Sequence, residues 1–514
     1  MIMYRNFLPK TYVLACIFFS QLLYIQIVKS QPNFIQDSLE NYIKQGMKDW
    51  QIPGLSIVIV KDGKIVTMKG YGVKDINGTD SVDSNTLFMI ASNTKLFTGT
   101  ALAQLEYRKK LSLDDKISKY FANFSLYEKN STEMVTIKDM LTHRIGTKTF
   151  QGDFTFFNGN ASRNSIIYKM RYLKPTGIFR QDYGYCNSCY LTAGEVIPEV
   201  TGQPWEVYIY DSIIMPLGMT QTLTLSKGIT QIKNAAKPYT TTFTGNLTQV
   251  PYDTWDNLAP AASIVSNVND LSHWLMMQLN NGKYNNQQII PTAAILKTRD
   301  IAIAVSSRKS SIYPINFRGY GLGVFAADYN GKQMYWHTGG ASGMVSNVCF
   351  VPEEKLGIAI LTNNDNQNFF EALRYQILDA YLGVPFINRS KQQLSNFLQA
   401  EQQTITQINA LKQRIKNNQP SLILENYVGT YTNELYGKLI IEQKENHLTI
   451  NFKGHDNLTA TVKYLDNDEW VIEYSNPLFG IFPLKFDIDN KKVTGVNIKV
   501  NDYVEMDAYK FIKQ

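Results

Sequence analysis

The feature that most constrains the fold is the separation of two β-rich segments by a long stretch with helical and loop patterns. Apolar runs at 55–60 and 65–68 flank the tetrapeptide Lys-Asp-Gly-Lys at 61–64. Asp-Gly between two such runs is a strong β-hairpin signal. A second β-rich segment, punctuated by glycines, covers 320–361. The pattern predicts an α+β domain whose antiparallel sheet closes from its two chain ends, with a helical subdomain between them.

A different pattern begins near the C-terminal end. Apolar residues keep a helical stripe from Leu394 to Ile415, set among Gln and Lys, and Pro420 ends it. From Tyr427 onward apolar and polar residues alternate, which is the period of half-buried strands. A chain of 514 residues is also too long for one core. We predict a first domain over 31–387, a helical connector over 388–424 and a small antiparallel β domain, barrel-like in character, over 425–514.

The first 30 residues have the features of a secretory signal peptide. Arg5 and Lys10 precede an apolar stretch over 12–28, and residues 28–30 (Val-Lys-Ser) suit a signal-peptidase cut. We predict that 1–30 is removed and that the mature protein is secreted or enters the lumen of the secretory pathway, with no membrane span left. An uncleaved signal anchor is the alternative, because the apolar run is long for a signal.

Asn-x-Ser/Thr sequons are spread along the chain and agree with this route. An Asn-rich chain produces several by chance, so they gain weight only beside a signal peptide. The glycosylation candidates are Asn77, Asn123, Asn130, Asn160, Asn246, Asn388 and Asn457.

Charge and cysteine content exclude several classes of partner. The formal net charge is +7, part of which lies in the leader, and blocks of Lys and Arg interleaved with aromatics are absent. We therefore expect no nucleic-acid partner. Outside the leader the cysteines are Cys186, Cys189 and Cys349, an odd number that argues against a disulfide scaffold. Cys186 and Cys189 have Cys-x-x-Cys spacing, but no second pair or nearby His completes a set, so we expect neither a metal nor another cofactor.

Ser92 and Lys95 form the first element with chemical meaning. They stand at the head of an apolar helical stripe, and positions i and i+3 of a helix share one face within about 5 to 6 Å. A serine hydroxyl needs a base nearby to act as a nucleophile. Burial and cationic neighbours would lower the pKa of the lysine enough for it to accept a proton.

The spacing alone is weak evidence, because Ser306-Ser307-Arg308-Lys309 has it too. That second segment leads into Tyr313-Pro314 and has no helical stripe, so the geometry that makes the spacing useful is missing. Ser92 by itself could equally be a simple helix cap.

Two further elements follow in order. Tyr185-Cys186-Asn187 is a Tyr-x-Asn motif, and residues 337–340 (His-Thr-Gly-Gly) follow on a predicted strand. Ser-x-x-Lys, Tyr-x-Asn and a third motif where Lys-Thr-Gly is expected resemble the class C β-lactamases and their relatives, the D,D-carboxypeptidases, D-aminopeptidases and certain esterases. The resemblance covers roughly residues 35 to 385. It implies the serine β-lactamase and penicillin-binding-protein fold.

The resemblance also implies a role for each motif residue. Ser92 is the acylated nucleophile, Lys95 shuttles its proton, and Asn187 binds a substrate amide or holds Lys95. Tyr185 is the general base, its phenol pKa lowered from about 10 by cationic neighbours. The implied catalytic residues are Ser92, Lys95, Tyr185, Asn187 and His337. Oxyanion-hole and substrate-binding residues are Ser92, Thr338, Gly339 and Gly340, with the backbone N–H groups of Ser92 and Gly340 facing the oxyanion.

Two departures from the family pattern bear on the reaction. His337 replaces the usual Lys and so removes a fixed positive charge that would attract a substrate carboxylate, while a neutral imidazole can donate or accept a proton. Siblings with His at this position are, as the resemblance implies, mostly peptidases and esterases. Cys186 and Cys189 lie within the Tyr-x-Asn loop, where they form a strained disulfide or pack as thiols, and we favour packing.

The sequence therefore predicts a secreted serine hydrolase that cleaves an ester, amide or peptide bond of a small-molecule or peptide substrate through an acyl-Ser92 intermediate. An esterase or a D-amino-acid-directed peptidase is favoured over a true β-lactamase. The alternative is a secreted binding or matrix protein that retains the fold without turnover, which the intact motif residues disfavour. The C-terminal unit resembles the lipocalin-like domains appended to some relatives, where it would cap the cleft or mediate assembly into a homo-oligomer.

Overall fold

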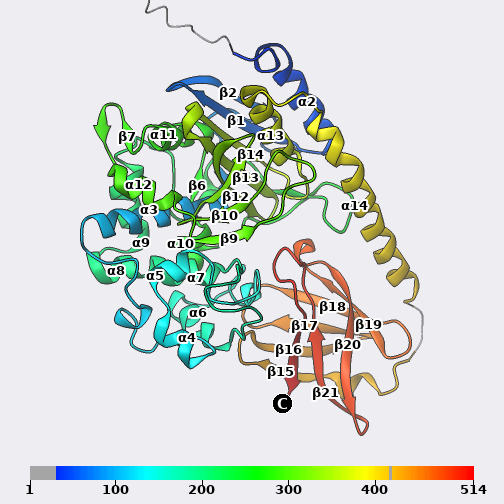
Figure 1. Cartoon of the computed structure of the whole chain (residues 1–514). Coiled ribbons are helices and arrows are strands. Elements are labelled where there is room, and N and C mark those ends of the chain that lie inside the picture. The colour runs from blue at the N-terminus through cyan, green and yellow to red at the C-terminus, as the bar shows by residue number, and fades with distance from the viewer. Residues whose placement is uncertain (1–30, 416–418) are drawn as a thin grey trace, which may run out of the picture.

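An antiparallel sheet of eight strands forms the centre of the first domain (Figure 1). The computed structural model describes residues 31–415 and 419–514, so the predicted signal peptide lies outside the described residues. From one edge to the other, the strands are β2 (Lys64–Gly72), β1 (Gly54–Lys61), β14 (Leu356–Thr362), β13 (Met344–Val351), β12 (Lys332–Ala341), β11 (Phe325–Tyr329), β10 (Arg318–Tyr320) and β9 (Ile303–Ser306).

This strand order joins the two ends of the domain, as the sequence pattern predicts. The Asp62-Gly63 turn closes the β1–β2 hairpin, and β1 then pairs along its length with β14, which follows it by about 300 residues in the sequence. Both faces of β1 are buried. Ile57 and Ile59 pack on one side with Leu39 of α2 (Leu39–Asp49) and with α13 (Phe369–Leu382).

The opposite face of the sheet carries the helices that hold the site. Val58 and Val60 pack into a second core together with Phe97 and Leu275, which belong to α3 (Thr94–Tyr107) and α11 (Val268–Leu279). The alternation of side chains along a strand sends Val58 and Ile59 to opposite faces. α3 is therefore buried between the sheet and the helical region, and nearly all its residues are inaccessible to solvent.

The helical region lies between β2 and β9 in sequence. Its remaining helices are α4 (Lys129–Met134), α5 (Ile137–Leu141), α6 (Arg163–Lys169), α7 (Asn187–Gly194), α8 (Val196–Thr201), α9 (Trp205–Ile209), α10 (Ala259–Ala262) and α12 (Thr292–Arg299). Its short strand pairs are β3 (Phe88–Met89) with β6 (Val265–Ser266), β4 (Tyr239–Thr240) with β5 (Thr248–Gln249), and β7 (Lys283–Tyr284) with β8 (Gln287–Gln288).

A long helix and a closed barrel complete the chain. The helix α14 (Arg389–Gln413) begins where the Asn388 side chain accepts a hydrogen bond from the Lys391 N–H, a few residues before the predicted stripe. It runs along the side of the molecule to the barrel (Figure 1). The barrel strands are β15 (Gly429–Asn433), β16 (Gly437–Lys444), β17 (His447–Phe452), β18 (Thr459–Tyr464), β19 (Glu469–Tyr474), β20 (Ile481–Asp489), β21 (Lys492–Ile498) and β22 (Tyr509–Lys513), with β22 pairing back to β15.

These observations confirm the predicted α+β architecture, with a helical region between the two ends of one antiparallel sheet, followed by a small antiparallel barrel. Six of the glycosylation candidates are exposed, whereas Asn388 is half-buried and caps α14. Among residues 31–415 and 419–514, no helix has the length and apolar character needed to cross a membrane.

Candidate active site

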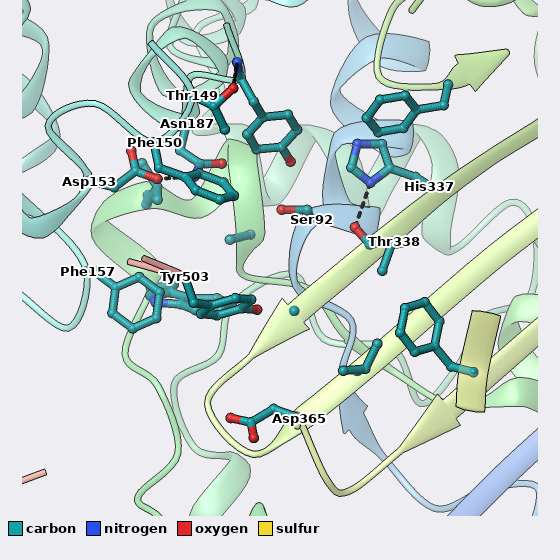
Figure 2. Close-up of a pocket in the computed structure, with 18 of the residues that line it drawn as sticks. Ser92, Thr149, Phe150, Asp153, Phe157, Asn187, His337, Thr338, Asp365 and Tyr503 are labelled. Atoms are coloured by element: carbon teal, nitrogen blue, oxygen red, sulfur yellow. Dashed lines mark hydrogen bonds between the residues drawn. The ribbon is translucent and has the colours of Figure 1, made fainter. Parts of the chain in front are cut away.

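Ser92 lies in a tight turn directly before α3. Residues Ala91–Asn93 form a single 3₁₀ turn that leads into the helix. Ala91 has φ of 47°, in the left-handed region that a buried residue with a Cβ adopts only when its surroundings hold it there. The Ser92 side chain is half-buried and lines a cavity of about 600 Å³. The helix start therefore presents the hydroxyl to this cavity rather than using it as a cap (Figure 2).

Lys95 lies one turn further along and is completely buried. Its Nζ is 3.0 Å from Ser92 Oγ, 2.7 Å from Asn187 Oδ1 and 2.9 Å from the backbone carbonyl oxygen of Ala261. A neutral amine has two N–H bonds and one lone pair. The Asn187 and Ala261 oxygens accept the two N–H bonds, so the lone pair of a neutral Lys95 is directed at the Ser92 hydroxyl.

Burial lowers the pKa of Lys95 to about 7. Desolvation disfavours the ammonium form, and it outweighs the opposite influence of the nearby Asp153 carboxyl. The predicted direction of the shift agrees with this result, but the cationic neighbours expected to contribute are not among its causes. Near neutral pH a large fraction of Lys95 is then in the form that can accept a proton.

Tyr185 corrects one expectation. The sequence predicted a lowered pKa for its phenol. Burial instead raises this pKa above the ordinary value, and a hydrogen bond with Ser92 opposes the shift without reversing it. The cation expected to lower it is Lys95, whose Nζ lies 4.8 Å from the centre of the Tyr185 ring but is itself deprotonated easily. The ring also stacks on His143, with centroids 4.3 Å apart. Tyr185 is thus a neutral phenol at physiological pH.

His337 lies at the middle of β12 and is almost fully buried. Its Nδ1 is 2.8 Å from the Thr338 carbonyl oxygen and its Nε2 is 3.0 Å from the Tyr320 hydroxyl. Burial, with a smaller effect of Lys95, lowers the pKa of the imidazole to about 3. The ring is neutral, with Nδ1 donating to the carbonyl and Nε2 accepting from the phenol. Both nitrogens are occupied by protein groups.

The C-terminal half of β12 has one open edge. β11 pairs with Lys332 to Trp336 only, whereas β13 pairs with β12 as far as Ala341. Among the described strands, none pairs with 337–341 on the side away from β13, and the carbonyl oxygens of His337 and Thr338 accept side-chain hydrogen bonds from Asn347 Nδ2 and His337 Nδ1. Gly340 lines the cavity on this edge, as does Thr338. Gly339 does not, and a Cβ there would lie 1.9 Å from the Ile90 carbonyl oxygen.

Asp153 belongs to the site although nothing in the sequence indicated it. It is 3% exposed, and its Oδ2 accepts a hydrogen bond from Asn187 Nδ2 at 2.5 Å. The structure thus supports the second of the two roles expected for Asn187, since its amide links Asp153 to Lys95. Burial raises the pKa of Asp153 well above its ordinary value. Asp153 therefore contacts the site through Asn187, whose amide it accepts a hydrogen bond from.

Aromatic side chains form most of the remaining cavity wall. The aromatic lining residues are Phe150, Phe157, Tyr183, Tyr185, Trp255, Phe325, Phe370 and Tyr503. Of these, Tyr503 comes from the C-terminal barrel domain, and it faces Ser92 across the cavity (Figure 2). Among the described residues that line the cavity, none is Lys or Arg.

The structure brings together most of the predicted residues and settles the cysteines. Ser92, Tyr185, Asn187, His337, Thr338 and Gly340 all line one cavity, with Lys95 directly beneath it. Cys186 and Cys189 are free, buried thiols, as the packing alternative predicts. Tyr320 and His143 also contact site residues, through the bond between the Tyr320 hydroxyl and His337 Nε2 and the stacking of His143 on Tyr185.

Comparison with known proteins agrees with this arrangement. A β-lactamase family model matches residues 39–382, and a model described as a domain of unknown function, DUF3471, matches residues 413–512. Protein flp of Staphylococcus aureus is 27% identical over 359 residues, which cover 68% of this chain and 67% of the relative. Unguisins hydrolase ungD of Aspergillus violaceofuscus is 25% identical over 382 residues, covering 69% and 66%.

A solved structure extends the likeness over both domains. The octameric penicillin-binding protein homologue from Pyrococcus abyssi superimposes with a TM-score of 0.59 at 23% identity, covering 92% of this chain and 99% of the other. That level of identity supports the fold. Because the family model covers about two thirds of the chain, including every motif residue, this protein belongs to the β-lactamase family of serine hydrolases.

Proposed function

We propose that this protein is a secreted hydrolase that cleaves uncharged esters or amides with an apolar acyl group, through an acyl-Ser92 intermediate. The observation that carries the proposal is the buried Lys95 Nζ, 3.0 Å from Ser92 Oγ, at the wall of an aromatic cavity. A buried lysine with a pKa of about 7 is matched to general-base work at neutral pH. The name of the fungal relative, a hydrolase of unguisins, supports hydrolysis as the reaction class.

In the acylation step, Lys95 is the base. The lone pair of its neutral Nζ takes the Ser92 hydroxyl proton while Ser92 Oγ forms a bond to the substrate carbonyl carbon. The carbonyl oxygen becomes an oxyanion, which the N–H groups of Ser92 and Gly340 stabilise. When the bond to the leaving group breaks, the leaving group takes a proton, and the neutral Tyr185 phenol, hydrogen-bonded to Ser92, relays it from Lys95.

The second step reverses these roles with water. A water molecule attacks the acyl carbon, Lys95 accepts one of its protons, and the bond to Ser92 Oγ breaks as the serine regains a proton. His337 holds the strand rather than carrying a proton, because Thr338 and Tyr320 occupy its two nitrogens. Its loss would disturb the geometry of β12 beside the oxyanion hole.

The charge of the cavity narrows the substrate class. β-Lactams and peptides ending in D-alanine present a carboxylate, and a carboxylate is bound best by Arg or Lys. The lining residues in the described part of the chain include neither, and His337 is neutral. Large aromatic side chains favour an apolar acyl group instead. Esterase or neutral-amide activity is therefore favoured over β-lactamase activity.

Secretion and glycosylation belong to the same proposal. The leader over 1–30 has the order of a signal peptide, and six sequon asparagines are exposed, as attachment of a glycan requires. Expression in a eukaryotic host with its native leader should yield protein in the medium whose mass falls after treatment with an N-glycosidase. Retention in the membrane fraction would support the signal-anchor alternative.

The central experiment is labelling with a fluorescent fluorophosphonate. Wild type and Ser306→Ala should be labelled equally, and Ser92→Ala should not be labelled. The same three proteins are then assayed with p-nitrophenyl esters, amino-acid anilides and nitrocefin, with ester hydrolysis expected to be fastest. Equal labelling of Ser92→Ala would disprove the acyl-Ser92 intermediate, and a folded, unlabelled wild type would favour the non-catalytic alternative.

A further inference from the structure

Tyr503 is delivered to the active site by the loop that joins β21 to β22. Its side chain is 38% exposed, and it is one of the residues that line the catalytic cavity. The phenol lies against the substrate-facing surface of β12. A Cβ placed on Gly340 would be 1.6 Å from the Tyr503 hydroxyl oxygen and 2.6 Å from the ring carbon that bears it. Tyr503 therefore occupies the space that a side chain at position 340 would fill.

The loop that carries Tyr503 is fixed to the catalytic domain by its acidic neighbours. Glu505 is 2% exposed, and its carboxylate accepts hydrogen bonds from the backbone N–H groups of Gly152 and Phe154, at 2.9 and 3.2 Å. The Tyr436 hydroxyl donates to the same carboxylate. Asp507 forms an ion pair with Lys148 at 2.6 Å. Two residues of the loop between β21 and β22 therefore bind the segment 148–154 of the catalytic domain.

The two domains also pack against each other next to these contacts. The Phe154 ring stacks on His455 of the barrel with centroids 4.4 Å apart, and its carbonyl oxygen is 2.7 Å from His455 Nε2. The backbone N–H of Asn160 donates to the Gly454 carbonyl oxygen at 2.9 Å. The Phe154–His455 contact is buried, and together with the hydrogen bonds of Glu505 it holds Tyr503 at a defined position rather than at the end of a free loop.

The unused hydroxyl of Tyr503 also points to a role toward substrate. In the described part of the chain, this hydroxyl has no hydrogen-bonding partner, and the ring faces the cavity (Figure 2). A tyrosine hydroxyl that forms part of a cavity wall usually finds a partner when it is covered. A substrate bound at the Gly340 N–H would come next to it.

We propose that Tyr503 is a specificity-determining residue, through which the barrel limits the bulk of the group attached to the reacting carbonyl. This inference rests on the proposed function. A carbonyl oxygen bound at the Gly340 N–H brings its acyl substituent beside the phenol, which leaves room for an unbranched or flat group. A branched carbon next to the carbonyl collides with the Tyr503 ring.

The test compares kcat/KM for p-nitrophenyl pivalate, which is branched, and p-nitrophenyl acetate, which is not. In Tyr503→Ala the pivalate-to-acetate ratio should rise about tenfold or more, the range expected when a pocket gains room for methyl-sized groups. Tyr503→Phe, which keeps the ring but removes the hydroxyl oxygen nearest Gly340, should raise the ratio by less than Tyr503→Ala does. Tyr464→Ala, a barrel tyrosine outside the cavity lining, is the matched control and should retain the wild-type ratio.

A second variant pair tests the contact with Gly340 directly. Gly340→Ala should lower kcat/KM for acetate, because the new Cβ and the phenol cannot occupy one place, and adding Tyr503→Ala should restore part of the loss. Independent effects of the two substitutions would contradict the contact. If Tyr503→Ala is labelled by the fluorophosphonate but leaves the ratio unchanged, this inference fails and the hydrolase survives. If wild type is not labelled, the result contradicts the proposed function itself, and the inference about Tyr503 falls with it.

Discussion

Two segments of this chain have the same Ser-x-x-Lys spacing, and only one of them places the lysine amine beside the serine hydroxyl. Ser92 and Lys95 lie at the start of α3, where one helical turn brings the two side chains within 3.0 Å. Ser306 is the last residue of β9, and Lys309 lies on the exposed loop that follows. The chain leaves the strand there without forming a helical turn, and Ser306 Oγ accepts a hydrogen bond from the Arg308 backbone N–H instead.

Burial is the second difference between the two segments. Lys95 is wholly enclosed between α3, α7 and α10, and its pKa falls to about 7 for that reason. Lys309 is exposed to solvent. The comparison shows that the Ser-x-x-Lys motif determines only which residue types are present. The helix start brings the two side chains together, and burial in the core lowers the pKa of the lysine.

The largest effect is expected from removing the amine. Lys95→Met keeps the length and apolar stem of the side chain but removes the base, so kcat/KM for the best ester should fall about 10³-fold, within the range that a general base contributes. Lys309→Met is the matched control and should stay within about twofold of wild type. A Lys95→Met enzyme with more than a tenth of wild-type activity would break the comparison.

The pH profile should separate the two lysines next. Lys95 must be neutral to accept a proton, and its ammonium form predominates below a pKa of about 7. We therefore expect kcat/KM to rise about tenfold per pH unit up to pH 7 and then to level off. Lys309→Met should reproduce the curve. A plateau that already extends to pH 5 would mean that another group is the base.

Much of the fold and half of the site could be predicted because they depend on local patterns. The hairpin at Asp62-Gly63 and the helix after Ser92 follow from short-range periodicity, and the order of the motifs identified Tyr185 and Asn187. Tyr503 could not be found in this way, because a loop of the barrel domain reaches the cavity only after the two domains pack together.

The predicted direction of the Tyr185 pKa shift was wrong for a related reason. Charge can be read from residue types, and so a lysine near a tyrosine suggested a lowered phenol pKa. Burial can be judged only once the core has formed, and here it is the largest cause of the pKa shift of Tyr185, Lys95 and His337. For this reason the proposed mechanism assigns the role of base to Lys95 and not to Tyr185.

The smallest expected effect sharpens what holds Lys95 in its place. Asp153→Ala removes the acceptor for Asn187 Nδ2, so the amide that orients Lys95 can rotate. Loss of one hydrogen bond is worth about 1 to 1.5 kcal/mol, or about tenfold in kcat, with KM nearly unchanged.

Asp153→Asn keeps a neutral acceptor of the same shape, matching a carboxyl whose pKa is raised by burial, and should stay within about twofold of wild type. A purely structural role would lower the melting temperature of Asp153→Ala without moving the pH profile, whereas a positioning role shifts the apparent pKa near 7. If Asp153→Asn is as impaired as Asp153→Ala, the carboxylate form of Asp153 is needed, and an uncharged acceptor is not enough to position Asn187.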